Sequence, residues 1–146
     1  MTGKIQYKPD GYHTVTPYLI VHDASSLIDF LKQVFDAREE QRFAQPDGSI
    51  MHAEVRIGDS VVMIADANEA NSPRAGMLHI YLEDMDTVYR RALVAGATSI
   101  REPEDQFYGD RTAGVEDPFG DQLWLTTHIE DVSPEELQRR METQAR

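Results

Sequence analysis

Residues 50–66 read IMHAEVRIGDSVVMIAD, in which two β-rich runs flank the pair Gly58-Asp59. A Gly-Asp pair between alternating runs is typical of a β-hairpin, so we predict strands over 50–57 and 60–66. If Ile57 pairs with Ser60, the small and apolar side chains of both strands share the face that packs on a helix. Strand alternation then places five other residues on the opposite face, namely His52, Glu54, Arg56, Val61 and Met63. That face is either an ordinary solvent-exposed sheet surface or the wall of a cavity.

The surroundings of this hairpin recur in the second half of the chain. Asp23 and Asp84 each follow a strand-like run and open a helical stretch. The turn Gly120-Asp121 repeats Gly58-Asp59 at nearly the same offset. The repeat predicts two modules, each with a strand, a helix and then two or three strands.

The module boundaries follow from the same landmarks. We expect one domain over 1–146, with modules at about 12–66 and 77–128 and a polar linker at 67–76. Ser133 precedes Pro134, and Glu136 stands three residues after the serine. This capping-box pattern predicts a charged C-terminal helix over about 133–146.

Composition limits the classes of function. The 146 residues carry a net charge of −12, which argues against nucleic acid as a partner because phosphate neutralisation needs a basic face. No apolar run approaches the roughly 20 residues of a membrane span, and we read no secretory signal. Cysteine is absent, which excludes disulfides and thiolate chemistry. We therefore expect a cytoplasmic protein with no membrane partner.

Four segments carry a resemblance to a known family, namely VTPYLIVHDASSLIDFLKQVFDA, HAEVRIGDSVVMIAD, HIYLEDMDTVYRRALVAGA and DQFYGDRTAGVEDPFGDQLWLTTH. Together they resemble the vicinal oxygen chelate superfamily of glyoxalases, bleomycin-resistance proteins and extradiol dioxygenases, in its PhnB-like branch. The likeness covers roughly residues 12 to 128. It implies an α+β fold in which two βαβββ modules form a curled, mixed β-sheet cup with helices on the outside. It also implies paired modules, which leads us to expect a homodimer.

Enzymes of this family hold a divalent metal with four side chains, usually His and Glu. The resemblance places those positions at Thr16, Met63, Met77 and Trp124, with Trp124 standing where a Glu is expected. A hydroxyl, two thioethers and an indole N–H are poor ligands for a hard or borderline divalent cation. We therefore expect neither the family metal nor another cofactor.

The same strand counting predicts a cavity with a mixed aromatic and polar lining. Its candidate ligand-binding residues are Tyr18, Arg56, Met63, His79, Tyr81, Gln122 and Trp124, joined at the rim by Tyr108 and Arg111 of the loop DQFYGDR over 105–111. Trp124 is either a stacking wall for a ligand or a core residue. The loop either binds ligand or is braced by an Asp–Arg pair.

Three hypotheses of function follow. In the first, the protein binds a small organic molecule, with an antibiotic as one example, without metal. In the second, it is a metal-dependent lyase, isomerase or dioxygenase with a non-standard site at His52, Glu54 and His79, since imidazole beside carboxylate is a workable general base. The alternative for these three residues is a hydrogen-bonded polar cluster. In the third, the C-terminal helix docks on a protein partner, which its polar character disfavours.

Overall fold

A computed structural model describes residues 5–144, and these divide into two compact units between Ala75 and Gly76. We name them unit 1 and unit 2, and each is described by itself. The last two residues of the helix expected over 133–146 lie outside the described residues. No helix among residues 5–144 is both long enough and apolar enough to cross a membrane.

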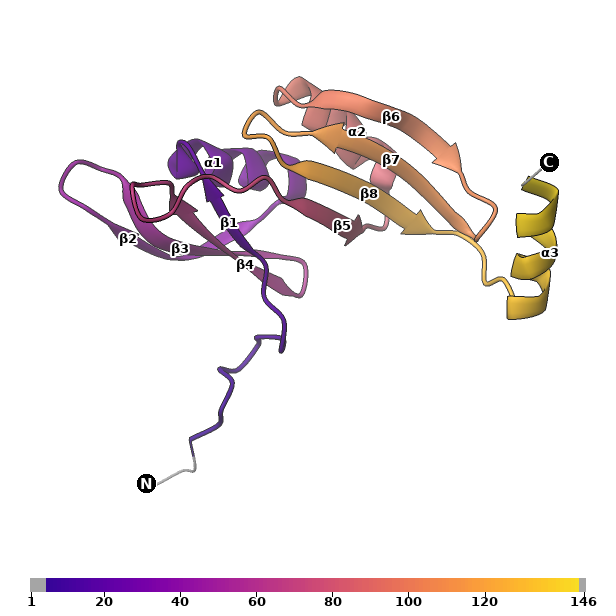
Figure 1. The fold of residues 1–146 in the computed structure, drawn as a ribbon, viewed down its shortest axis with the longest axis horizontal. Helices are drawn as coiled ribbons and strands as arrows, with labels where there is room; N and C mark the ends of the chain where they lie inside the picture. The colour runs from indigo at the N-terminus through magenta and orange to yellow at the C-terminus, as the bar shows by residue number, and fades with distance from the viewer. Residues whose placement is uncertain (1–4, 145–146) are drawn as a thin grey trace. The chain divides into compact units, whose positions relative to one another are not determined.

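Unit 1 is a four-stranded mixed sheet with one helix against it (Figure 1). Its elements are β1 (Tyr18–Val21), α1 (Ala24–Phe35), β2 (Arg38–Ala44), β3 (Ile50–Ile57) and β4 (Ser60–Asp66). The strand order is β1-β4-β3-β2, with β1 parallel to β4 and the other pairs antiparallel.

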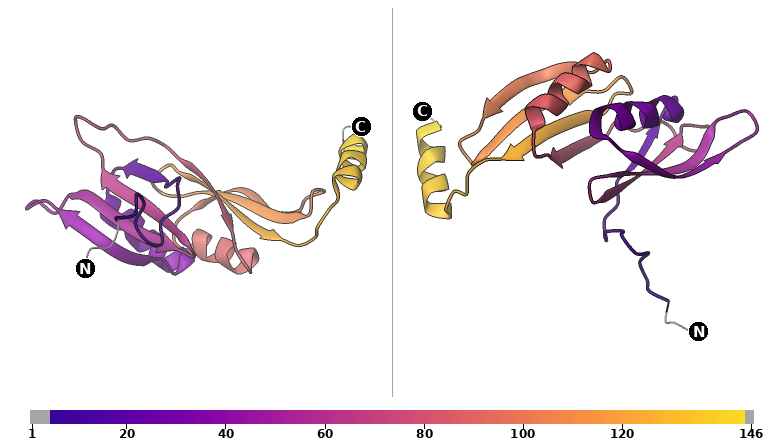
Figure 2. Two further views of the ribbon diagram at one scale, coloured as in Figure 1. Left: turned by 90° about the horizontal axis from the view of Figure 1, so that it is seen from below. Right: turned by 180° about the vertical axis from the view of Figure 1, so that it is seen from behind.

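Unit 2 repeats this topology. Its elements are β5 (Met77–Tyr81), α2 (Met85–Val94), β6 (Thr98–Asp105), β7 (Asp110–Glu116), β8 (Gln122–His128) and the added α3 (Pro134–Gln144). The order is β5-β8-β7-β6, again with only the β5–β8 pair parallel. The predicted α+β fold of two βαβββ modules is therefore confirmed, and both views of Figure 2 show the two sheets with their helices.

The hairpin register is the one that strand alternation predicts. Ile57 pairs with Ser60 and Val55 with Val62, and these inward residues pack under α1. The helix presents a continuous apolar stripe to them, made of Leu27, Ile28, Leu31 and Val34, all fully buried. Burial of this stripe removes apolar surface from water and so stabilises unit 1.

The helix ends also follow local rules. Asp23 is the N-cap of α1, where its carboxylate accepts from the backbone N–H of Ser26 at 3.2 Å. Ser133 caps α3 by accepting from the backbone N–H of Glu136 at 3.1 Å, as the capping-box pattern predicts. Gly96, with φ +108, ends α2 in a left-handed conformation that suits glycine.

The expected loop over 105–111 is shorter than predicted. β6 continues to Asp105 and β7 begins at Asp110, so that only residues 106–109 connect the two strands. Asp110 and Arg111 belong to the strand because they pair with His128 and Thr127 of β8. The polar composition of the segment concealed this pairing, because the buried Asp110 is accommodated by His128 and Arg111 by two carboxylates.

A buried acidic pair closes the turn before β8. Asp117 accepts from the backbone N–H groups of Phe119 and Asp121, and Asp121 accepts from that of Gly76 at 2.8 Å. The Oδ2 atoms of both carboxyls are buried, and neither accepts a hydrogen bond from the described residues. Burial, and then the neighbouring Asp121, raise the pKa of Asp117 to about 7. Burial also raises the pKa of Asp121.

This pair predicts that unit 2 loses stability as pH rises. The folded protein holds a proton that the unfolded chain releases near the usual carboxyl pKa of 3.8. The stabilisation is therefore complete below that pH and is lost as pH rises through about 7. We expect the free energy of unfolding, followed by fluorescence of the single tryptophan, to fall by about 2 kcal/mol between roughly pH 5 and 8.

The Asp121→Asn variant should flatten this dependence, because an amide supplies the Asp117 carboxylate with a donor. The matched control is Asp59→Asn, which makes the same change in the exposed turn of unit 1. Hydrogen bonds to Asp131 and Asp110 raise the pKa of His128, so this residue also makes the protein less stable as pH rises. Its contribution is the same in the unmodified protein and in both variants. An unchanged slope in Asp121→Asn would show that the pair does not carry a proton.

Candidate functional site

The face of the unit 1 sheet that points away from α1 carries the predicted polar residues. Glu54 pairs with Met63 and Arg56 with Val61, so the four side chains lie on this open face. Glu54 is nevertheless only 6% exposed. A carboxylate so deeply covered needs partners that satisfy its oxygens.

Those partners form a continuous chain of side chains. Tyr12 donates from its phenol to Oε1 of Glu54, and His52 Nε2 lies 2.8 Å from Oε2. The other ring nitrogen of His52 lies 3.0 Å from the phenol oxygen of Tyr18. We name this the Tyr18–His52–Glu54–Tyr12 chain. The predicted pair His52 and Glu54 is therefore brought together, and both tyrosines join it.

The hydrogen bonds of the Tyr18–His52–Glu54–Tyr12 chain set the charge state of the Glu54 carboxyl group. Burial alone would raise the pKa of Glu54, but the hydrogen bonds from His52 and Tyr12 outweigh it and hold the pKa below its usual value. The same hydrogen bond to Glu54 raises the pKa of Tyr12. At neutral pH, Glu54 is thus an ionised acceptor and Tyr12 a neutral donor.

Residues 5–17, which we name the N-terminal segment, supply Tyr12 and cover part of this face. Figure 1 shows the segment leading away from the start of β1, and hydrogen bonds from Tyr12 and to Gly11 tie it to the sheet. Arg56 holds it by donating from Nη1 to the carbonyl oxygen of Gly11 at 3.0 Å, while its Nη2 lies 3.0 Å from Glu40. Arg56, which was predicted to bind ligand, therefore anchors the N-terminal segment.

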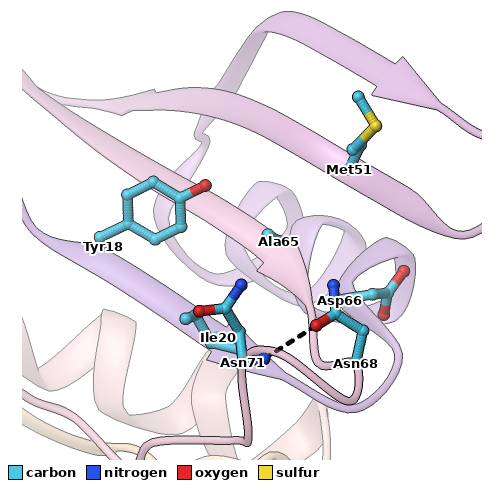
Figure 3. A pocket seen from close by; sticks show the side chains of 7 residues that line it. All are labelled: Tyr18, Ile20, Met51, Ala65, Asp66, Asn68 and Asn71. Atoms are coloured by element: carbon cyan, nitrogen blue, oxygen red, sulfur yellow. Dashed lines mark hydrogen bonds between the residues drawn. The ribbon is translucent and has the colours of Figure 1, made fainter.

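Two cavities flank the Tyr18–His52–Glu54–Tyr12 chain. The larger, of about 570 Å³, lies between the N-terminal segment and the sheet. It is lined by Tyr7, Lys8, Pro9, Tyr12, His13, Thr14, Thr16, Gln41, Glu54 and Met63. The smaller, of about 260 Å³, is bordered by Tyr18 and Met51 and by the turn after β4 (Figure 3). There Asp66 is already engaged by the backbone N–H groups of Ala24 and Ile50, so its role is structural.

Unit 2 presents a different set of residues on its equivalent face. His79 pairs with Trp124, which pairs with Gly114, which pairs with Arg101, so that one row crosses all four strands. Since Gly114 has no side chain, the indole ring of Trp124 lies directly on its backbone. Trp124 therefore does not pack in the core beneath α2, and its Nε1 donates to Gln122 at 3.2 Å.

The remaining predicted residues of unit 2 lie in two groups. His79 Nε2 is 2.9 Å from the hydroxyl of Thr126, and its ring centroid is 5.1 Å from that of Tyr81, which is 67% exposed. Tyr108 packs edge-on against Phe107 at the hairpin tip. Arg111 pairs with Asp86 and with Asp105, each at 2.9 Å. Arg111 therefore braces the hairpin against α2, as the Asp–Arg alternative had it.

The four positions that the resemblance assigns to the family's metal ligands lie on these faces. Thr16 and Met63 line the larger cavity, and Met77 and Trp124 lie on the open face of unit 2. Their donor set does not suit Mg²⁺, Zn²⁺ or Fe²⁺. Over residues 5–144, no three side chains of His, Cys, Asp or Glu gather in a way that would hold a metal ion.

Two residues of these faces escaped sequence reasoning. Tyr12 lies 42 residues before its partner Glu54, in a segment without periodicity. Arg101, whose guanidinium carbon lies 5.0 Å from the centroid of the Trp124 ring, belongs to a strand with register shifts on both sides of it. Strand counting fails at such irregularities, and no other signal in the sequence marks either residue.

The contact between Trp124 and Gly114 predicts the effect of a single methyl group. A Cβ at position 114 would lie 2.7 Å from two carbons of the indole ring, so Gly114→Ala must displace the ring. We expect a loss of about 1–3 kcal/mol in the free energy of unfolding and a red-shifted tryptophan emission. In a Trp124→Leu background the same substitution should cost much less, and an equal cost measured by circular dichroism would contradict the contact.

Removing the Tyr12 phenol predicts release of the N-terminal segment. In Tyr12→Phe, the buried Glu54 loses a donor, and we expect a cost of about 1–2 kcal/mol together with faster amide hydrogen exchange over residues 9–17. Tyr7→Phe is the matched control, because Tyr7 lies on the same segment and is 92% exposed. Equal exchange rates in the two variants would show that Tyr12 does not hold the segment.

Comparison with known proteins relates this architecture to others. An uncharacterised protein of Mycobacterium bovis is 37% identical over 141 residues, covering 89% of this chain and 93% of the relative. An uncharacterised protein of Mycobacterium tuberculosis is equally similar and is covered to 83%. Among solved structures, TioX from Micromonospora sp. ML1 superposes with a TM-score of 0.69 at 26% identity, over 79% of this chain and 98% of that one.

The fold is shared more widely than the sequence. The PhnB protein of Bacillus cereus has a TM-score of 0.62 at 16% identity, over 79% of this chain and 99% of that one. The sequence model of the Glyoxalase/Bleomycin resistance protein/Dioxygenase superfamily matches residues 12–125, which include every strand of both units except the last three residues of β8. The duplicated βαβββ topology, its mixed sheets and this match together show that the chain belongs to the glyoxalase/bleomycin resistance protein/dioxygenase superfamily.

Proposed function

We propose that the protein binds a small organic molecule on the open sheet faces, without the divalent metal of the family's enzymes. One observation carries the proposal. Thr16 and Met63, which the resemblance places at two of the family's metal-ligand positions, line a cavity of about 570 Å³ and offer it a hydroxyl and a thioether. A volume of this size falls within the range of about 300–1,000 Å³ typical of sites for small molecules.

The chemistry of the larger cavity suits an amphipathic ligand. Tyr12 and Met63 offer apolar and aromatic surface, whereas Glu54 and Gln41 offer polar atoms near the floor. Because Glu54 already accepts from His52 and Tyr12, it holds the wall in shape and leaves few lone pairs for a ligand. Shape and apolar contact therefore contribute most to binding in this cavity.

A metal-dependent lyase, isomerase or dioxygenase is the alternative function. The distance of 2.8 Å between His52 Nε2 and Glu54 favours it, since a carboxylate that orients an imidazole is a feature of both general bases and metal sites. In this alternative, His52 and Glu54 of unit 1 would contribute ligands to a non-standard site in place of the family positions.

The proposal includes a homodimer in the cytoplasm. Both sheets have open edge strands, β1 and β2 in unit 1 and β5 and β6 in unit 2, that a second copy would cover. On β5, Met77 and Tyr81 are 66% and 67% exposed, which is apolar area available for such a contact. The absence of cysteine suits a reducing compartment, and the net charge of −12 argues against a nucleic-acid partner.

Elemental analysis and ligand screening together test the proposal. We expect purified protein to contain no stoichiometric metal and to be stabilised against heat by members of a panel of amphipathic aromatic compounds that includes antibiotics. Chelator treatment should leave that stabilisation unchanged. Filling the larger cavity with Met63→Phe should weaken binding about tenfold, whereas Met51→Phe, at the smaller cavity, should not.

Two results would contradict it. Stoichiometric metal that disappears in His52→Ala or His79→Ala, with turnover of a hemithioacetal or a catechol, would establish the enzyme instead. A broad panel without one saturating compound would remove the binding function.

A further inference from the structure

The row His79–Trp124–Gly114–Arg101 on the open face of unit 2 ends in an unusual cation. Arg101 is half-buried, and its Nη2 donates to the hydroxyl of Thr112. Its Nε is buried and has no hydrogen-bond partner among the described residues. A buried N–H of a charged group that lacks an acceptor is costly, so the site is electrostatically incomplete.

Within the described part of the chain, Arg101 shares the lack of a carboxylate partner with the exposed Arg38, Arg74 and Arg90, but it differs from them in being half-buried with a buried, unpartnered Nε. Arg42, Arg111 and Arg140 each lie within 2.9 Å of a carboxylate oxygen. No carboxylate among residues 5–144 lies within ion-pair distance of Arg101, although the chain contains 26 acidic residues. The partners of this positive charge among the described residues are therefore neutral, namely the hydroxyl of Thr112 and the ring of Trp124.

Because Nε is buried, the donors of Arg101 that remain for a ligand are those of its terminal Nη groups. A guanidinium that lies against an aromatic ring keeps its N–H groups in its own plane, where two of them match the two oxygens of a carboxylate or phosphate. Thr112 holds one Nη in place, which fixes the orientation of the group before any ligand arrives. Beyond the indole ring, His79 and the exposed Met77 and Tyr81 continue the same face with aromatic and apolar surface.

We propose that the row His79–Trp124–Gly114–Arg101 binds a planar organic anion, with its acidic group on Arg101 and its apolar body across Trp124 toward His79. This inference rests on the proposed small-molecule function and names the chemical class of ligand for unit 2. The net charge of −12 opposes anions at long range. Recognition therefore depends on direct contact with Arg101, and a monoanionic carboxylate is favoured over a dianionic phosphate.

Three matched probes test the charge requirement in the unmodified protein. Para-nitrobenzoate, para-nitrophenyl phosphate and the neutral para-nitrobenzamide carry the same nitroaromatic ring, which quenches indole fluorescence on contact. Because Trp124 is the only tryptophan, quenching reports on this face alone. We expect saturable quenching by the benzoate, weaker binding of the phosphate, and at least about tenfold weaker binding of the amide. Tighter binding of the phosphate would keep the anion site and assign it to phosphate.

Variants test the residue. Arg101→Gln should weaken binding of para-nitrobenzoate about tenfold, and Arg101→Lys should give an intermediate loss because it keeps the charge but not the planar donors. Arg90→Gln removes the same charge from an exposed site on α2 and should leave binding unchanged. Tryptophan emission of the unliganded Arg101 variants, compared with that of the unmodified protein, shows whether the ring has kept its place.

The outcomes separate this inference from the proposed function. Equal affinity for para-nitrobenzamide and para-nitrobenzoate would overturn the anion site and leave small-molecule binding intact. Saturable quenching by none of the three probes would also overturn it, while the cavity of unit 1 would still be judged by the compound panel and Met63→Phe. Equal losses in Arg101→Gln and Arg90→Gln would show a general charge effect and reject the role of Arg101.

Discussion

The pairing of Ile57 with Ser60 across a two-residue turn is the constraint on which the rest of unit 1 depends. Because side chains alternate along a strand, a slip of one residue would turn Val55 and Ile64 away from α1 and turn Glu54 into the core. The apolar stripe of α1 makes that slip very unfavourable, since an ionised carboxylate cannot be buried beneath it without partners. One register therefore determines both the core and the polar face.

This register leaves polar side chains on the open faces of the sheets. Polar groups that cannot enter the core must find partners on the other side of the sheet or stay in water. In unit 1 the N-terminal segment meets this requirement. Its Tyr12 donates a hydrogen bond to Glu54, and its Gly11 carbonyl accepts one from Arg56. In unit 2 no such segment is present among residues 76–144, and Arg101 is left with a hydroxyl and an aromatic ring as its partners.

The sequence predicts the features that follow from the spacing of residues along a strand or helix. It does not predict contacts between residues that are far apart in the sequence. The hairpin and the start of α3 could be predicted because each is set by residues within one turn or strand, and the duplicated topology could be predicted because its landmarks recur along the chain. Tyr12 could not be linked to Glu54, because no periodic pattern connects a non-regular segment to a strand far along the chain. Arg101 could not be assigned to a face, because β6 shifts register on either side of it. Neither the Gly11 carbonyl as a partner of Arg56 nor Asp86 as a partner of Arg111 could be derived from the sequence, since the nearest acceptor to an arginine is set by the tertiary fold.

The two units solve the same packing problem in different ways. Met63 and Trp124 occupy matching positions on the last strand of each unit, and their partners on the neighbouring strand are Glu54 and Gly114. A flexible thioether leaves room for a carboxylate beside it, whereas an indole ring fills the space over a residue that has no side chain. Trp124 and Gly114 are therefore coupled, and placing a Glu at 124 alone would leave an unfilled space over Gly114 beside the cation Arg101. The aromatic residue at position 124 is thus built into the packing of the sheet, because its ring fills the space over Gly114 and lies beside the guanidinium of Arg101.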